Sequence, residues 1–126
     1  MTSQPRPRQL SIVIPVLDEA AGIADLLTSL HDLRQNGAEV IVVDGGSNDD
    51  TARLAAPHAD LVISAPRGRG AQMNAGAAAA CGSIMLFLHA DTRLPAAAET
   101  LIVQAIDRGA IWGRFDVKIE GQAAGF

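Results

Sequence analysis

The feature that most constrains this chain is a short apolar run that recurs four times, each time followed by a polar turn. The runs are Leu10–Pro15, Glu39–Val43, Asp60–Ser64 and Ser83–Leu88. Continuous apolar runs of this length are typical of strands that are buried on both faces of a parallel sheet. Because segments with helical spacing separate the runs, we predict an α/β domain with a mostly parallel, open sheet and helices on both faces.

The first two intervening segments predict two helices. Apolar residues recur at helical spacing from about Ala20, and Asn36-Gly37 is a stop signal. Ser47 and Asp50 have the spacing of a capping box, which predicts that a short helix begins there and ends at Pro57.

The second half of the chain predicts an Ala-rich helix over Ala71–Cys81, with Gly76 and the alanines allowing it to approach the sheet closely. The single cysteine excludes an intrachain disulfide, and its setting predicts a small buried residue. A further helix from Pro95 and a last strand at Ile111–Ile119 complete the expected order. An open sheet edge near this last strand leaves homodimerisation open.

The net charge of −4 argues against a nucleic-acid surface, which needs a basic face. Any bound phosphate must therefore be held by a few arginines, backbone N–H groups or a metal. Residues 1–9 are polar with two prolines and predict a flexible tail, and residues 10–126 form the expected domain. No signal peptide or membrane span is visible, so the expected location is the cytoplasm, with peripheral docking at the inner face of the membrane left open.

A polar group follows each of the four predicted strands. These groups are Pro15–Glu19, Asp44–Thr51, Arg67–Gly70 and His89–Asp91. Ligands of open α/β sheets bind outside the carboxyl ends of the strands. We therefore expect all four groups to line one edge of the sheet and to form a binding site.

The residue types suggest what this site binds, although each also has a purely structural interpretation. Asp44 is either a turn residue or a ligand contact, and the glycine after it lets a ligand approach the backbone. Arg67 precedes a helix amino terminus, which suits an anion. Asp91 follows an apolar strand and is either a turn residue or a ligand of a hard cation such as Mg²⁺ or Mn²⁺. A dinucleotide fingerprint is excluded, because Gly68-Arg69-Gly70 lacks the last glycine and follows the third strand.

Four motifs, in this order and spacing, are shared with a known family. They read Ser11-Ile-Val-Ile-Pro-Val-Leu-Asp-Glu19, Val42-Val-Asp-Gly-Gly-Ser-Asn-Asp-Asp-Thr51, Arg67-Gly-Arg-Gly-Ala-Gln-Met-Asn-Ala-Gly76 and Phe87-Leu-His-Ala-Asp91. They resemble family 2 glycosyltransferases of the GT-A fold, and the match spans about Leu10 to Val117. The resemblance implies a Rossmann-like domain that binds a nucleoside-diphosphate sugar.

The resemblance also assigns roles to residues. It implies nucleoside contacts in the first motif, a base contact at Asp44 and a nucleotide-facing loop in the third motif. In the fourth motif His89 stands where the family has the first Asp of Asp-x-Asp, while Asp91 retains the metal-binding position. The nucleotide-sugar-binding residues expected in this way are Pro15, Val16, Glu19, Asp44, Gly45, Arg67, Gly70, Ala90 and Asp91.

By this resemblance the chain is expected to transfer a sugar from a nucleoside diphosphate, with uridine as the expected base, to an unknown acceptor with inversion and metal assistance. The acceptor half and the general base are expected beyond Phe126, so the chain is expected to be cut short. The alternative is a nucleotide-binding module with no transfer activity. A nucleotidyltransferase is disfavoured, because it needs a Gly-rich basic loop where this chain has Val16–Gly22.

Overall fold

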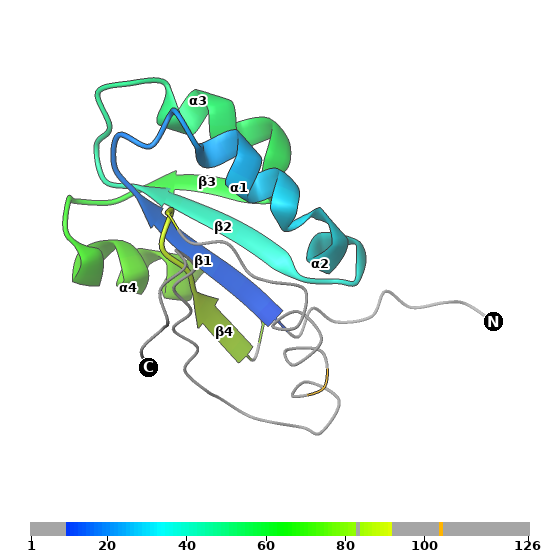
Figure 1. Cartoon of the computed structure of the whole chain (residues 1–126). Coiled ribbons are helices and arrows are strands. Elements are labelled where there is room, and N and C mark those ends of the chain that lie inside the picture. The colour runs from blue at the N-terminus through cyan, green and yellow to red at the C-terminus, as the bar shows by residue number, and fades with distance from the viewer. Residues whose placement is uncertain (1–9, 83, 92–103, 105–126) are drawn as a thin grey trace, which may run out of the picture.

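The computed structural model describes residues 10–82, 84–91 and 104. Within them, four parallel strands form one sheet in the order β3-β2-β1-β4 (Figure 1). The strands are β1 (Leu10–Val16), β2 (Glu39–Asp44), β3 (Leu61–Ser64) and β4 (Ile84–Phe87). The predicted α/β class with a parallel sheet is confirmed. The predicted tail and the strand at Ile111–Ile119 lie outside the described residues, as does the helix from Pro95 except for Gln104, which is helical.

Helices cover both faces of the sheet, as Figure 1 shows. One face carries α1 (Ile23–Ser29), α2 (His31–Gln35) and α3 (Thr51–Ala55), which runs into a 3₁₀ turn at Ala56–His58, and the other carries α4 (Arg69–Ala79). Because side chains alternate along a strand, β1 and β2 need apolar residues on both sides. The side chains packed with α1 and α2 are Ile12, Ile14, Val16, Val40 and Val42, and those toward α4 are Val13, Ile41 and Val43.

The packing of α4 on the sheet depends on Gly76. A Cβ atom at this position would lie 2.3 Å from Cγ1 of Val13 and 3.1 Å from Cγ2 of Val43. Both valines are fully buried in the centre of the sheet. The helix therefore approaches the strands too closely for any side chain at position 76, and the predicted packing role of this glycine is confirmed.

The first predicted helix differs from the structure. The helix expected from Ala20 begins only at Ile23 and is divided at Leu30. The hydroxyls of Thr28 and Ser29 donate to the carbonyls of Ala24 and Leu26, a pattern of side-chain bonding that bends helices.

The Ala-rich helix begins at Arg69 and ends at Ala79, two residues earlier at each end than predicted. Gly68 precedes it with a φ of +135°, which favours glycine. Because the helix ends early, Cys81 follows it in an extended segment and is exposed. The prediction that this cysteine is buried was wrong.

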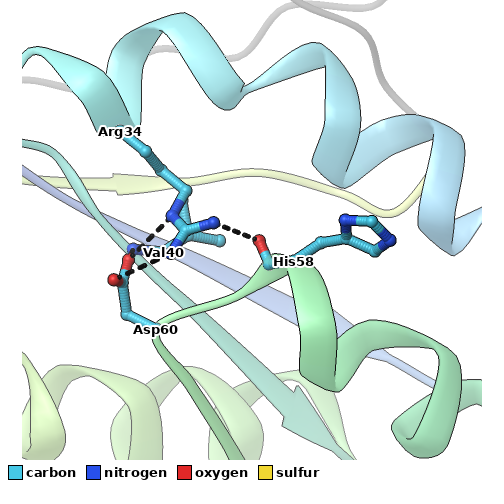
Figure 2. Close-up of polar contacts among 4 residues, drawn as sticks. All are labelled: Arg34, Val40, His58 and Asp60. Atoms are coloured by element: carbon cyan, nitrogen blue, oxygen red, sulfur yellow. Dashed lines mark hydrogen bonds and ion pairs between the residues drawn. The ribbon is translucent and has the colours of Figure 1, made fainter.

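An ion pair between Arg34 and Asp60, with two further hydrogen bonds, joins the amino ends of β2 and β3 (Figure 2). We call this group of contacts the clasp. Arg34 at the end of α2 donates from Nε and Nη2 to the two carboxylate oxygens of Asp60, at 3.3 and 3.2 Å. Its Nη1 donates to the carbonyl of His58 at 3.0 Å, and Asp60 Oδ2 also accepts from the backbone N–H of Val40 at 2.7 Å. The clasp joins α2, the 3₁₀ turn and the first residues of two strands.

A second network lies at the same edge of the sheet, under β1. The buried hydroxyl of Ser11 donates to Oε1 of the buried Glu39 at 2.8 Å and accepts from the backbone N–H of Gly82 at 2.9 Å. The same carboxylate oxygen accepts from the backbone N–H of Cys81 at 2.9 Å. These bonds attach the segment between α4 and β4 to the amino ends of β1 and β2.

Candidate nucleotide-binding site

The parallel sheet brings the carboxyl ends of its four strands to one edge, here called the carboxyl edge. Val16 ends β1 and pairs with Asp44, which ends β2. Asp44 in turn pairs with Ser64, after which the chain leads to Arg67. On the other side of β1, β4 leads to Asp91. The polar groups that follow the strands therefore share one edge, as predicted from the sequence.

Asp44 is almost completely buried, and its carboxylate shapes the turn that follows it. Oδ2 accepts from the backbone N–H groups of Gly46 and Ser47 at 3.2 and 3.1 Å, and Oδ1 accepts from the hydroxyl of Ser47 at 2.5 Å. The turn interpretation of this residue is therefore realised in the structure. A carboxylate has about four acceptor positions, of which the turn uses three, so Asp44 retains capacity for one ligand N–H.

The loops after β1 and β2 are joined by side-chain bonds in both directions. The backbone N–H groups of Asp18 and Glu19 donate to the hydroxyls of Ser47 and Thr51, each at 2.8 Å. The backbone N–H of Asn48 donates back to Oδ1 of Asp18 at 2.7 Å. Asp18 adopts a φ of +53°, which non-glycine residues seldom occupy. These bonds hold the two loops as one unit.

The predicted capping box is not formed, because its hydroxyl is used elsewhere. Asp50 precedes α3 and makes no side-chain cap, and the helix begins at Thr51. Ser47 instead binds Asp44 and the loop after β1. Thr51 donates its hydroxyl to Asp49, and this bond is the main reason that the pKa of Asp49 lies below its ordinary value. Ser47 therefore connects loops and does not cap a helix, while Asp49 accepts from the backbone N–H of Thr51, the first residue of α3, at 3.0 Å.

Negative charge accumulates at the carboxyl edge. Partial burial, and then the nearby charges of Asp91, Asp49 and Asp18, raise the pKa of Glu19 above its ordinary value of 4.5. Asp91 itself is exposed at the turn after β4, next to the half-buried Ala90. Among the described residues no group of three or more His, Cys, Asp or Glu side chains is arranged to hold a metal by itself. Mg²⁺ and Mn²⁺ bind through one or two carboxylates together with phosphate oxygens, so the donors fit such an ion when a phosphate ligand completes its coordination.

Cationic side chains lie beside this acidic group, at the start of α4. Nη2 of Arg69 lies 3.2 Å from Nδ1 of His89, so the exposed His89 forms a hydrogen bond with an arginine. Arg67 is exposed in the loop before the helix. Gly70 was expected in that loop but lies in the first turn of α4, because the helix begins at Arg69. Its backbone N–H therefore belongs to a helix terminus that favours anions.

Sequence reasoning missed one buried residue behind the site. Gln72 lies in α4, is 5% exposed, and bonds to the ends of both β1 and β2 and to the start of its own helix. One polar residue in an Ala-rich helix produces no periodic signal. Its sequence signals are that it is an amide among alanines and glycines and that it lies within the third motif, Arg67–Gly76.

The parallel sheet, with polar loops at its carboxyl edge, defines the class as an open α/β domain, whose ligands bind at this edge. The chain belongs to glycosyl transferase family 2, because the model of that family matches residues 11–124. Among the curated proteins, an uncharacterised glycosyltransferase of Mycobacterium bovis is 33% identical over 102 residues, which cover 80% of this chain and 45% of that protein. The pre-mycofactocin glycosyltransferase of Mycobacterium tuberculosis is 38% identical over 97 residues, which cover 71% of this chain and 19% of that protein.

Solved structures of similar fold are GT-A glycosyltransferases. Glucosyl-3-phosphoglycerate synthase of Mycobacterium tuberculosis, in complex with Mn²⁺, uridine diphosphate and glucosyl-3-phosphoglycerate, superposes with a TM-score of 0.61 at 32% identity. The match covers 67% of this chain and 34% of the synthase. Mannosyl-3-phosphoglycerate synthase of Rubrobacter xylanophilus gives a TM-score of 0.60 at 28% identity, over 68% of this chain and 31% of that protein. The chain thus spans less than half the length of these relatives. No helix in the described part of this chain has the length and hydropathy that crossing a membrane requires.

Proposed function

We propose that this chain is the donor-binding part of a glycosyltransferase that takes its sugar from a nucleoside diphosphate, with uridine as the base. The observation that carries this proposal is that polar groups from all four strands share the carboxyl edge. In this proposal residues 10–126 are the donor-binding domain, and a further segment supplies the acceptor site and the general base for an inverting transfer.

In this proposal, different residues contact different parts of the nucleoside-diphosphate sugar. The remaining acceptor position of Asp44 suits the N–H of a pyrimidine base. Gly45 follows it directly and is the second residue assigned to the base, although its own open side is occupied by Gln72 and not by a ligand. Val16 pairs with Asp44, Pro15 precedes Val16 in β1, and Glu19 lies in the loop that follows; these three residues contact the nucleoside in this proposal. Binding of a neutral base against buried carboxylate and backbone groups gives orientation and specificity.

The diphosphate falls between the acidic and the cationic groups of the edge. Arg67 and the backbone N–H of Gly70 suit phosphate oxygens, while Asp91 and the neighbouring turn residue Ala90 lie at the end of β4. Bound Mn²⁺ or Mg²⁺ would neutralise charge on the departing nucleoside diphosphate. Asp91 would hold that ion. The negative charge of Asp91 contributes to the raised pKa of Glu19, which indicates that the two carboxylates lie near each other. The complexes of glucosyl-3-phosphoglycerate synthase with Mn²⁺ or Mg²⁺ and uridine diphosphate support this choice of ligands.

The test is calorimetric titration of the chain with uridine diphosphate, in the presence of Mn²⁺ and then with the metal removed by a chelator. We expect binding that requires the metal, and we expect Asp91→Asn to weaken it by at least about tenfold, the lower end of the effect of outer-shell metal partners. Asp32→Asn is the matched control, because Asp32 is an exposed carboxylate on α2, outside the proposed site.

Two results would contradict the proposal. Binding of uridine diphosphate that needs no metal and is unchanged in Asp91→Asn would remove the assignment of Asp91. Rapid sugar transfer by the 126-residue chain alone would show that the general base lies within it.

A further inference from the structure

The buried amide of Gln72 joins three separate parts of the carboxyl edge. Its Nε2 donates to the carbonyl of Val16 at 3.0 Å and to the carbonyl of Val43 at 2.9 Å. Its Oε1 accepts from the backbone N–H of Gly68 at 3.1 Å. Both N–H donors and the acceptor of one side chain are therefore used, and every partner is a backbone group.

These backbone groups lie where the two central strands give way to the loops of the site. Val16 is the last residue of β1, and Val43 is the last but one of β2. The carbonyl of Val16 also accepts from the backbone N–H of Gly45 at 3.0 Å. Buried carbonyls need a donor. Gln72 of α4 supplies an N–H donor to the carbonyl of Val16 in β1 and another to the carbonyl of Val43 in β2.

The third hydrogen bond of Gln72, to the Gly68 N–H, connects the two strands to the loop before α4. Gly68 precedes the helix with a φ of +135°, and its N–H is held by Oε1 of Gln72 one turn later. Arg67 and Gly70 are its near neighbours in the chain. The Gln72 amide therefore ties the start of α4 to the ends of β1 and β2, in addition to the pairing of Ser64 with Asp44 and the bond from the Ala65 N–H to the Asp44 carbonyl.

Gly45 is also held against this amide. A Cβ atom at position 45 would lie 2.7 Å from Oε1 and 2.8 Å from Cδ of Gln72. The backbone after Asp44 thus packs directly on the side chain that holds Gly68. Both sides of the proposed nucleotide site contact the same group.

We infer that Gln72 is a positioning residue for the nucleoside diphosphate: it sets the spacing between the base-binding side at Asp44 and Gly45 and the phosphate-binding side at Arg67 and Gly70. This inference rests on the proposed function. Gln72 does not contact the nucleotide, since it is buried behind the loops, and it acts through the backbone groups that it holds.

The variant Gln72→Met tests the inference, because methionine has a similar length but neither donates nor accepts a strong hydrogen bond. Gln72→Glu retains an acceptor for Gly68 while removing both donors to the strands. Uridine diphosphate affinity is measured by calorimetry with Mn²⁺, at a temperature where circular dichroism shows each variant to be folded. We expect both variants to bind roughly tenfold to a hundredfold more weakly, the range seen when an outer-shell group that orients the ligand contacts is lost.

Ser11→Ala is the matched control for a general loss of stability. It removes two hydrogen bonds at the amino edge: one joins Ser11 of β1 to Glu39 of β2, and the other attaches the segment after α4, at Gly82, to β1. We expect it to lower the denaturation midpoint while leaving uridine diphosphate affinity unchanged. If Gln72→Met and Gln72→Glu lose stability but bind uridine diphosphate as the wild type does, the inference is overturned and the proposed function stands. If the wild type itself binds no nucleoside diphosphate, the proposed function has failed.

The wild-type chain provides a second measurement if neither variant folds. Hydrogen exchange of the Gly68 amide, followed by nuclear magnetic resonance, reports on the bond to Gln72. Saturation with uridine diphosphate and the diamagnetic ion Mg²⁺ is expected to slow this exchange and to shift the side-chain amide signals of Gln72. Unchanged exchange and unchanged signals in the saturated chain would overturn the inference.

Discussion

Replacing Gly76 by alanine tests how closely α4 approaches the sheet. In most helices this change is favourable by about 1 kcal/mol, because glycine is a poor helix former. Here the new methyl group would lie 2.3 Å from Cγ1 of Val13. We therefore expect the opposite sign, and the size of the effect follows from the contact.

Carbon atoms pack at roughly 3.5 to 4.0 Å, so the methyl group overlaps Val13 by more than about 1 Å. Val13 is fully buried and β-branched, which leaves it few rotamers that relieve the overlap. Overpacking of this kind costs about 1 to 3 kcal/mol, and the tight fit places Gly76→Ala near the upper end. After the gain in helix propensity, the expected net loss of stability is about 2 kcal/mol.

Urea denaturation followed by circular dichroism measures this loss, which corresponds to a fall of roughly 1 M in the midpoint. Asn74 is exposed in the middle of the same helix, so the difference between Asn74→Ala and Asn74→Gly gives the propensity contribution alone. In Gly76→Ala combined with Val13→Ala, the smaller neighbour accommodates the methyl group, and we expect a smaller loss than the sum of the single losses. A stabilised Gly76→Ala, or additive losses in the double variant, would refute the close approach.

Two further predictions concern the charged groups at the two edges of the sheet. Arg34→Met removes the ion pair with Asp60 and the bond to the His58 carbonyl. Because the side chains of Arg34 and Asp60 are only 28% and 20% exposed, we expect the free energy of unfolding, measured by urea denaturation, to fall by about 1 to 2 kcal/mol. Uridine diphosphate affinity is expected to stay unchanged, and weaker nucleotide binding would contradict this. The pKa of Glu19 is raised in the folded chain, so its contribution to stability is present below pH 4.5 and is lost as the pH rises through the folded pKa. Glu19→Gln is therefore expected to raise the urea midpoint at neutral pH and to reduce the loss of stability above pH 4.5. A lower urea midpoint at neutral pH would show that the charged Glu19 carboxylate stabilises the folded chain.

The sheet and the location of the site could be predicted because they follow from two strong regularities. Apolar runs of strand length, such as the one ending at Val16, leave few alternatives to a strand buried on both faces. Once the strands are parallel, their carboxyl ends share an edge, and so the groups at Asp44 and Asp91 come together without further information. Both predictions depend on chain topology and on no individual side-chain contact.

The hydrogen bonds within the site could not be predicted in this way. Ser47 has the spacing of a cap, but a hydroxyl binds a local helix and a distant loop with similar energy, and here Asp18 and Asp44 are its partners. Gln72 contributes through backbone groups that are up to 56 positions away in the chain. Such contacts exist only after the fold has brought the segments together, so no local pattern records them.

The carboxylates at the amino edge of the sheet have hydrogen-bonding or charged partners, whereas Glu19 and Asp91 at the carboxyl edge form no ion pair among the described residues. This difference is relevant to function. At the amino edge the carboxylate of Asp60 is paired with Arg34, and Glu39 accepts from a buried hydroxyl and a backbone N–H. At the carboxyl edge no ion pair among the described residues involves Glu19 or Asp91, and Asp91 contributes to the raised pKa of Glu19. Folding alone would favour neutralising this repulsion. A bound divalent cation, shared with a diphosphate, would do so, and the unneutralised charge is the physical reason to expect metal-dependent nucleotide binding at this edge.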